Sequence, residues 1–468
     1  AEKYVDSQDI QTLEQIVYEM QLDYYSDLSD EELLDAAEWF GPWLDLSYGF
    51  YKVGKYYYYP GFQEPGSIVT LGIGLKTWEG LSEEHKAIIE SAAARKSSKI
   101  DLLPLNILRL TAHQLLTLET APHAAVDTAV RLAVKNKHGS ASGFVNAVAR
   151  RISEKSLSEW VHNLTHILEP IDALAIKFAH PRWIVESYLA RLGNLEEVEK
   201  ELLANNVNPL TTAVIYPGNE WSRSTFEATH PAPWSESCRY VEGNPESLPE
   251  IRSGAAGIQD QGSFLVAQAL ARVPTQAKGD GLWLDMCAGP GGKAALLDRW
   301  ATQSGNTFLG LEISEHRAAL INRVSRSVVV ADSAQPPIRE GGALKILLDA
   351  PCSGLGALRR RPDARHRKTR AGVIELVQLQ RSLLKSAIEL LADGGVLGYV
   401  TCSPVIEETE ANTAWLLENF KEMELIDARP YFPSEMHFGE SFDVQLWPGK
   451  HKTDAMYLAL FKKLGKSS

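Results

Sequence analysis

The second half of the chain alternates between short apolar runs and longer amphipathic stretches. The apolar runs predict strands at residues 283–286, 308–312, 328–332, 346–349, 396–401 and 456–461. Helices are predicted between these strands, most clearly over residues 374–391. Strands that alternate with helices are typical of a mostly parallel sheet. We therefore expect a doubly wound α/β domain over residues 256–468, with its ligand at the carboxyl ends of the strands.

The first half of the chain predicts mainly helices. Helical spacing of apolar residues is found over 102–118, 127–135, 182–192 and 264–270. Another predicted helix ends in Arg150 and Arg151, which can either bind phosphate or stabilise the carboxyl end of a surface helix. Residues 205–218 predict a loop and a strand. Residues 231–254, rich in Pro, Ser and Gly, predict a linker inside a linking subdomain of residues 161–255.

Composition and charge restrict the class of protein. The net charge of -13 argues against a uniformly basic surface, although a local basic patch is still possible because screening acts over roughly 8–10 Å. The four cysteines form no Cys-x-x-Cys pair, so neither a metal site nor a disulfide framework is expected, and a reducing compartment fits. No membrane-spanning run or signal peptide is recognisable. We expect a monomeric cytoplasmic protein without metal or membrane contact.

A glycine-rich turn follows the first predicted strand. Residues 281–293 read Gly-Leu-Trp-Leu-Asp-Met-Cys-Ala-Gly-Pro-Gly-Gly-Lys. Glycines at such a turn let the backbone approach a ligand closely. The turn is not a Walker phosphate loop, because Cys287 stands where that motif requires Gly and Ala294 where it requires Ser or Thr.

Acidic residues end the predicted strands around this turn. Asp285 ends the first strand, Glu312 the second, Asp332 the third and Asp349 the fourth. Glu312 is placed to accept hydrogen bonds from ribose hydroxyls, and Asp332 to contact an adenine amine. The alternative for each acid is a polar cap on a buried strand. Acids at successive strand ends beside a glycine turn favour a nucleoside-type ligand.

Two cysteines occupy matching places after the fourth and fifth predicted strands. Cys352 lies in Asp-Ala-Pro-Cys-Ser-Gly and Cys402 in Thr-Cys-Ser-Pro. Because successive strand ends line one crevice, we expect both thiols to face the same ligand. A thiolate there can add to C6 of a pyrimidine, which makes C5 able to attack an electrophilic methyl group. For Cys287 a buried apolar role and a chemical role both remain open.

A basic run lies directly after the Cys352 loop. Such a run is usually a solvated surface, but here it adjoins the predicted active site of an otherwise acidic chain, which favours phosphate binding. The candidate phosphate contacts are Arg359, Arg360, Arg361, Arg365, Arg367, Lys368 and Arg370.

Three of these stretches match, in order, the motifs of a known family. They are Asp-Met-Cys-Ala-Gly-Pro-Gly-Gly-Lys at 285–293, Asp-Ala-Pro-Cys-Ser-Gly at 349–354 and Tyr-Val-Thr-Cys-Ser at 399–403. The chain resembles the RNA cytosine-C5 methyltransferases, specifically the bacterial ribosomal RNA branch called RsmB, Sun or Fmu. The resemblance covers about residues 100–463. It implies a Rossmann-like, class I methyltransferase domain, preceded by a helical, NusB-like RNA-binding region at residues 99–160.

The resemblance also implies roles for individual residues. Cys402 would be the nucleophile, Cys352 would assist product release, and Asp349 would contact the base near N3. The substrate would be a cytosine of small-subunit ribosomal RNA, flipped out of an opened or single-stranded region. The implied contacts to the cofactor S-adenosylmethionine are Asp285, Cys287, Ala288, Gly289, Pro290, Gly291, Gly292, Lys293, Glu312, Asp332 and Asp349.

The chain departs from the family pattern in several places. Ala294 replaces a frequent Thr, residues 212–217 lack the Leu-Arg-Val-Asn signature, and the first NusB-like helices are not recognisable before Ile100. These departures keep open an alternative function as an RNA-binding ribosome-assembly factor that has the cofactor fold but little turnover.

The segment before residue 99 has a different character. Residues 36–98 include Trp-Phe-Gly-Pro-Trp at 39–43 and Lys-Thr-Trp-Glu-Gly-Leu at 76–81. This segment resembles part of the solute-binding proteins of TRAP-type transporters, with an aromatic-rich packing segment as the alternative. It covers only part of such a receptor, so a solute-binding function is a remote alternative. Residues 1–35 predict polar helices without assigned chemistry.

Overall fold

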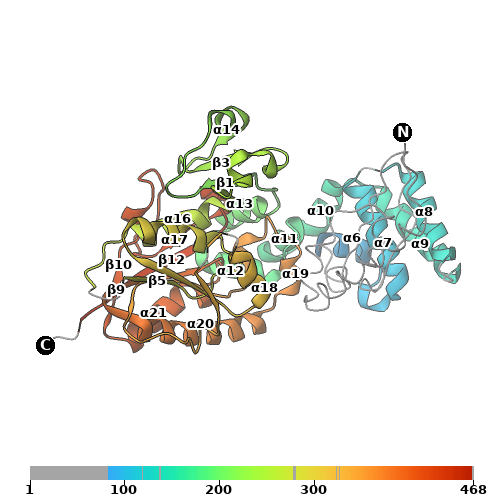
Figure 1. The fold of residues 1–468 in the computed structure, drawn as a ribbon. Coiled ribbons are helices and arrows are strands. Elements are labelled where there is room, and N and C mark those ends of the chain that lie inside the picture. Colours follow the sequence, from blue (N-terminus) through green and yellow to red (C-terminus); the bar gives the residue numbers. More distant parts are fainter. Residues whose placement is uncertain are drawn as a thin grey trace, which may run out of the picture. The chain divides into compact units, whose positions relative to one another are not determined.

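A computed structural model describes residues 83–465 except 119, 136–138, 278–280, 323 and 326. The chain divides into two compact units, one up to Trp160 and one from Val161 onward. Figure 1 shows the fold, coloured along the sequence. The polar helices predicted in residues 1–35, and the solute-receptor-like segment up to residue 82, lie outside the described residues.

The first unit is built from helices that pack on one another. Its core is apolar and includes Ile89, Leu108, Ala129 and Val148, each nearly or fully buried. Helix α6 lies before Ile100, where the sequence showed no recognisable helix of this region. The elements are α6 (Glu83–Ala93), η1 (Ser97–Lys99), α7 (Leu102–Leu116), α8 (Pro122–Lys135), η2 (Gly139–Ala141) and α9 (Ser142–Ser153), followed by α10 (Leu157–Thr165).

The second unit begins with helices and a small antiparallel sheet of strand order β2-β3-β1-β4. The linker predicted at residues 231–254 is wrong, because this stretch contains β3, η3 and α15, and β3 pairs with both β1 and β2. Its Pro, Ser and Gly residues form the turns between short elements, and the buried Arg239 donates hydrogen bonds to the hydroxyl and carbonyl oxygens of Thr229. The elements are α11 (Pro170–Lys177), α12 (Arg182–Leu192), α13 (Leu195–Asn205), β1 (Thr211–Ile215), α14 (Arg223–Ala228), β2 (His230–Pro231), β3 (Cys238–Val241), η3 (Pro245–Ser247), α15 (Pro249–Arg252) and β4 (Ala256–Ile258).

The main sheet has the strand order β10-β12-β9-β8-β5-β6-β7, with β11 paired to β12. The segment β9-β8-β5-β6-β7 is parallel, and β12 is antiparallel to β9. The strand order reverses at β5, which lies between β6 and β8, and ligands of open α/β sheets bind at such a point. The strands are β5 (Leu282–Asp285), β6 (Thr307–Glu312), β7 (Val328–Val330), β8 (Ala343–Asp349), β9 (Leu391–Thr401), β10 (Met423–Ile426), β11 (Val444–Gln445) and β12 (Tyr457–Lys463).

Helices cover both faces of this sheet, as the doubly wound prediction requires. Trp283 points into the core shared with α16 and α17, while Leu284 points into the opposite core shared with α20. This alternation follows from the two-residue period of a strand. The helices are α16 (Gln261–Arg272), α17 (Gly292–Gln303), α18 (Glu315–Ile321), α19 (Ala364–Arg367), α20 (Arg370–Leu390), α21 (Glu410–Asn419) and α22 (Pro448–His451), with η4 (Leu355–Ala357), η5 (Ile406–Glu408) and η6 (Arg429–Tyr431).

A third apolar cluster joins the helices α11–α13 to the loops at the strand ends. Tyr188 and Leu202 pack there with Leu355 and Val405. The Tyr188 hydroxyl also donates a hydrogen bond to the Leu355 carbonyl at 3.2 Å. The linking helices therefore support the loops that follow β8 and β9. Among the described helices, none combines the length and apolar character needed to span a membrane.

Candidate active site

The glycine turn after β5 adopts backbone angles that exclude most other residues. Gly289 has φ +54° and Gly291 has φ +102°. A Cβ atom on Gly291 would lie 2.9 Å from a methyl carbon of Val324 and 3.3 Å from Cα of Ile321. Only glycine fits both constraints. The turn therefore brings its backbone close to α18 and opens into α17 at Gly292.

Two carboxylates frame this turn. Asp285 is almost fully buried, and burial, followed by the charge of Asp349, raises its pKa to about 7. Glu312, which ends β6, accepts hydrogen bonds from the N–H groups of Gly289 (2.9 Å) and Ser314 (3.0 Å) and from Arg317 Nε (3.0 Å). Glu312 thus fixes the turn as well as ending its strand.

Asp332 lies farther from its strand than we predicted. Strand β7 ends at Val330, and Asp332 follows in a turn, where its Oδ1 accepts a hydrogen bond from the Ala334 N–H at 2.9 Å. The next residue, Ser333, bonds through its hydroxyl to the Met286 carbonyl at the end of β5. This contact brings the turn that carries Asp332 to the edge of the sheet where Asp285 lies.

Two buried oxygens beside the turn have no hydrogen-bond partner among the described residues. They are Asp285 Oδ2 and Gln259 Oε1. Gln259 lies against Gly292, where an added Cβ would meet the Gln259 amide at 3.4 Å. Buried polar atoms normally have partners, so these acceptors fit a ligand that carries N–H or O–H groups. A nucleoside with a charged amino-acid group, such as S-adenosylmethionine, has such donors.

The structure brings Cys352 and Cys402 together, although 49 residues separate them in the sequence. Each lies after a parallel strand, and β8 and β9 pair with Asp349 opposite Val400. The pKa of Cys352 is raised well above its usual value, first by a hydrogen bond with the Cys402 thiol and second by burial. Both causes favour the protonated form of Cys352. Cys287 also has a raised pKa, caused by burial and by the charge of Asp285.

Lys293 joins the glycine turn to the cysteine loops. Its Nζ lies 2.7 Å from Asp349 Oδ2, and both side chains are largely buried. Burial alone would lower the pKa of Lys293, but the charge and hydrogen bond of Asp349 raise it, with further contributions from Asp285 and Cys402. A permanent cation therefore lies among the two carboxylates and the Cys402 thiol.

Sequence reasoning missed the group behind the two cysteines. Glu408 is fully buried and accepts hydrogen bonds from the hydroxyls of Ser353 and Ser403, each at 2.6 Å. The one signal in the sequence was that Ser follows each of the two cysteines. Gly356 was also missed: its N–H donates to the Cys402 carbonyl at 2.9 Å, and a Cβ there would lie 2.2 Å from the Ala455 carbonyl oxygen.

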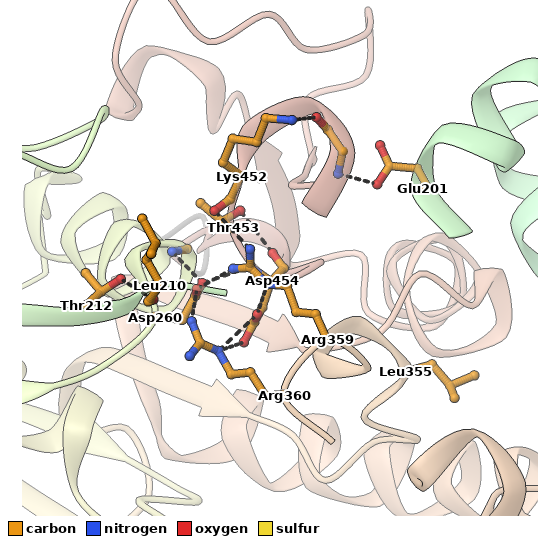
Figure 2. A network of polar contacts seen from close by, with 12 residues as sticks. Glu201, Leu210, Thr212, Asp260, Leu355, Arg359, Arg360, Lys452, Thr453 and Asp454 are labelled. Carbon is orange, nitrogen blue, oxygen red and sulfur yellow. Dashed lines mark hydrogen bonds and ion pairs between the residues drawn. The ribbon is translucent and has the colours of Figure 1, made fainter. Parts of the chain in front are cut away.

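The start of the basic run is tied into the protein. Arg359 donates to Asp454 Oδ1 and to Asp260 Oδ2, both at 2.7 Å, and Arg360 pairs with the same two acids (Figure 2). The side chains of Arg359, Asp260 and Asp454 are all more than nine-tenths buried. The network links the loop after η4 to the start of α16, and its arginines are occupied by carboxylates.

The rest of the run divides into buried and accessible cations. Arg365 is buried and donates to Asn206 Oδ1 at 2.8 Å and to the Ala179 carbonyl, and Arg367 pairs with Asp363. Neither side chain is exposed, although we predicted both as phosphate contacts. Arg361 and Arg370 are exposed and Lys368 is half-buried; in the first unit Arg150 and Arg151 are exposed, and Arg151 donates to the Ala92 carbonyl.

Family models match three parts of the chain. The model described as 16S rRNA methyltransferase RsmB/F matches residues 272–462, and the NusB family model matches residues 79–154. The second match begins twenty residues before the boundary that we predicted at 99, and it includes α6. Residues 28–101 match the bacterial extracellular solute-binding protein family 7, in agreement with the resemblance noted for residues 36–98.

Relatives extend the similarity over most of the chain. A Mycobacterium tuberculosis protein that carries the name of a methyltransferase is 39% identical over 392 residues, covering 81% of this chain and 84% of the relative. Ribosomal RNA small subunit methyltransferase B of Klebsiella pneumoniae is 28% identical, covering 74% and 79%. The crystal structure of PH0851 has a TM-score of 0.64 at 21% identity, covering 83% of this chain and 88% of that one, which confirms the predicted fold class.

Proposed function

The chain belongs to the 16S rRNA methyltransferase RsmB/F family, and we propose that it methylates C5 of a cytosine in small-subunit ribosomal RNA. We propose further that the reaction passes through a covalent bond between the Cys402 sulfur and C6 of that cytosine. The observation that carries this proposal is the contact between Cys352 and Cys402 beside the Lys293–Asp349 ion pair.

The cofactor is S-adenosylmethionine, which supplies an electrophilic methyl group. Asp285 and Gln259 would accept hydrogen bonds from it through their partnerless oxygens, and the glycine turn at 289–292 would let it approach the backbone. Glu312 and Asp332 are the candidate contacts to its ribose and adenine.

The cysteine pair supports separate roles for its two members. Because the protonated form of Cys352 is favoured, its S–H can donate a hydrogen bond to a thiolate on Cys402, and the Lys293 ammonium attracts the same charge. Both interactions favour Cys402 as the nucleophile. Addition at C6 makes C5 a carbon nucleophile. After methylation a base must take the C5 proton, so that the C–H electron pair re-forms the C5–C6 double bond and the C6–S bond breaks to release the Cys402 thiolate. We propose that Cys352 assists this release.

Asp349 is the candidate contact to N3 of the base. Its Oδ2 is held by Lys293, and about a third of its side chain is exposed at the carboxyl end of β8. A cytosine that reaches this carboxylate and Cys402 together must leave its base stack. We propose that Arg361, Lys368 and Arg370, and in the first unit Arg150 and Arg151, contact the phosphates of the surrounding RNA. We also propose a monomeric, cytoplasmic enzyme.

The proposal is tested by incubating the full chain with methyl-labelled S-adenosylmethionine and a small-subunit ribosomal RNA transcript. Digestion of the RNA should release the label as 5-methylcytidine, and Cys402→Ala should incorporate none. A labelled base other than 5-methylcytosine would refute the specificity. Binding of RNA without any labelling by the wild-type chain would instead support an assembly factor.

A further inference from the structure

A buried carboxylate lies behind the two cysteines and has no role in the chemistry described above. Glu408, the last residue of η5, accepts four hydrogen bonds. Its Oε1 accepts from the Ser353 N–H at 2.8 Å and from Gln380 Nε2 at 3.1 Å. Its Oε2 accepts from the hydroxyls of Ser353 and Ser403, both at 2.6 Å. None of these donors is a cation, and Glu408 makes no ion pair among the described residues.

An anion in such a place requires these four donors. Burying a carboxylate without partners is strongly unfavourable, whereas hydrogen bonds to the charged form compensate and are roughly twice as strong as neutral ones. The donors are also fixed. Gln380 is fully buried, and its amide nitrogen also donates a second hydrogen bond, to the Pro351 carbonyl at 2.8 Å. The carboxylate is therefore held in one orientation, with Oε2 directed at the two serines.

The serines connect this carboxylate to the thiols. Ser353 directly follows Cys352, and Ser403 directly follows Cys402. Their hydroxyl oxygens lie 3.1 Å apart and share the same Oε2. A shift of either loop would lengthen a short hydrogen bond on Glu408. The carboxylate thus couples two loops that come from neighbouring strands.

We propose that Glu408 is a positioning residue that holds the thiols of Cys352 and Cys402 at a fixed separation through Ser353 and Ser403. The inference rests on the proposed function, because it explains how one thiol forms the adduct while the other assists its release. The two serine hydrogen bonds then act in different steps of the reaction. The bond from Ser403 to Glu408 positions the nucleophile Cys402, and the bond from Ser353 positions Cys352, which assists release.

Substitutions of Glu408 and of each serine distinguish the roles of the two hydrogen bonds. Glu408→Gln keeps the side-chain volume but replaces one accepting oxygen with an NH2 group, so we expect kcat to fall about 10- to 100-fold, the range for a small misplacement of reacting groups. The KM for S-adenosylmethionine should stay unchanged. Ser403→Ala should slow formation of the protein–RNA adduct. Ser353→Ala should slow its release, so that the adduct accumulates during turnover.

A second measurement probes the thiols without RNA or cofactor. Phenylarsine oxide binds tightly only where two thiols can bond the same arsenic, so its affinity reports their separation. We expect Glu408→Gln to weaken its binding about tenfold or more, because the second thiol no longer acts at high effective concentration. Cys352→Ser should remove the bidentate binding. Thr413→Val is the matched control, since it loses a buried 2.7 Å hydrogen bond to Tyr457 in the same domain without touching either loop.

The outcomes are distinct. Wild-type kcat and arsenical affinity in Glu408→Gln would overturn the proposal, as would equal losses in Thr413→Val. If Glu408→Gln unfolds, the two serine variants decide, and identical effects on adduct formation and release in both would also overturn it. If the arsenical affinity falls as expected but even the wild-type chain transfers no methyl group, the positioning of the thiols holds and the proposed function fails.

Discussion

At the ends of β8 and β9 the carboxylate of Glu408 binds four donors, whereas at the end of β5 one oxygen of Asp285 and the amide oxygen of Gln259 bind none among the described residues. Glu408 and Asp285 are both buried, and both lie near the carboxyl ends of strands of the main sheet. They differ in the partners of their buried oxygens. In the cysteine region the protein supplies every hydrogen-bond donor to Glu408, whereas in the glycine-turn region two acceptors are available to a ligand.

This difference reflects the task of each region. Reacting groups must be held in place before the substrate arrives, which requires a satisfied supporting network. A binding site for a polar cofactor must instead keep acceptors available, and the folded protein bears the cost of burying them. Lys293 belongs to both regions, because it begins in α17 next to the turn and ends on Asp349.

The largest expected effect comes from the network of Arg359 and Arg360 with Asp260 and Asp454, which links the loop after η4 to the start of α16. Arg359→Met should destabilise the protein by about 3–5 kcal/mol, because it removes the more deeply buried of the two cations that pair with Asp260 and Asp454. Arg360→Met should cost less, since its side chain is 30% exposed. Thermal or denaturant unfolding measures both. If Arg359→Met unfolds like the wild type but binds RNA more weakly, Arg359 belongs to the RNA surface and not to this network.

The next effect concerns the residue that joins the two regions. Lys293→Met should lower single-turnover methyl transfer about 10²–10³-fold, as expected for loss of a preorganised charge in an active site. It should also raise the pKa of Asp285 further, because the Lys293 charge lowers it. Lys385→Met, on the exposed side of α20, is the control. A normal transfer rate in Lys293→Met would show that the two regions act independently.

Removing the charge of Asp285 should have opposite effects on the stability of the folded protein and on its affinity for the cofactor. Its folded pKa of about 7 lies above the unfolded value of about 3.9. Between these values the folded state binds more protons, so the ligand-free protein loses stability as pH rises from 4 to 7. Asp285→Asn should therefore stabilise the protein at pH 8 by about 1–3 kcal/mol more than at pH 4, while weakening cofactor binding. Unfolding at both pH values, with calorimetry against S-adenosylhomocysteine, measures the two effects. Equal stabilisation at both pH values would contradict a buried, raised carboxyl.

The smallest effect lies outside both regions, at the accessible end of the basic run. Arg370→Gln should weaken RNA binding a few-fold and reduce the slope of log K against log salt by about one. Lys421→Gln, an exposed cation after α21, should change neither quantity. The same slope in both variants would place the RNA on another surface.

The sequence predicted the parallel sheet well because its cause is local. Every predicted strand of the main sheet has an observed counterpart, since short apolar runs between turn residues favour strands over helices. The linking subdomain was misjudged for a related reason. Its strands are short, β2 having only two residues, and the Pro, Ser and Gly residues between them have the composition of a linker.

Which side chains meet could be predicted only in part. Strand ends placed Asp285, Glu312, Asp349 and the cysteines near one another, and the structure brings Asp285, Asp349 and both cysteines together. The partners of Arg359 could not be predicted, because Asp260 and Asp454 lie about a hundred residues away in opposite directions along the chain. A basic run shows its charge in the sequence, but the carboxylates that neutralise it appear only in the fold.

In the proposed mechanism Cys402 makes the covalent bond and Cys352 assists its release. The most direct measurement incubates Cys352→Ala with S-adenosylmethionine and the ribosomal RNA transcript, then maps any protein–RNA crosslink by mass spectrometry. We predict a stable adduct on Cys402 that is absent from the Cys352→Ala/Cys402→Ala double variant. An adduct on Cys287, or unimpaired turnover by Cys352→Ala without any adduct, would contradict the assigned roles.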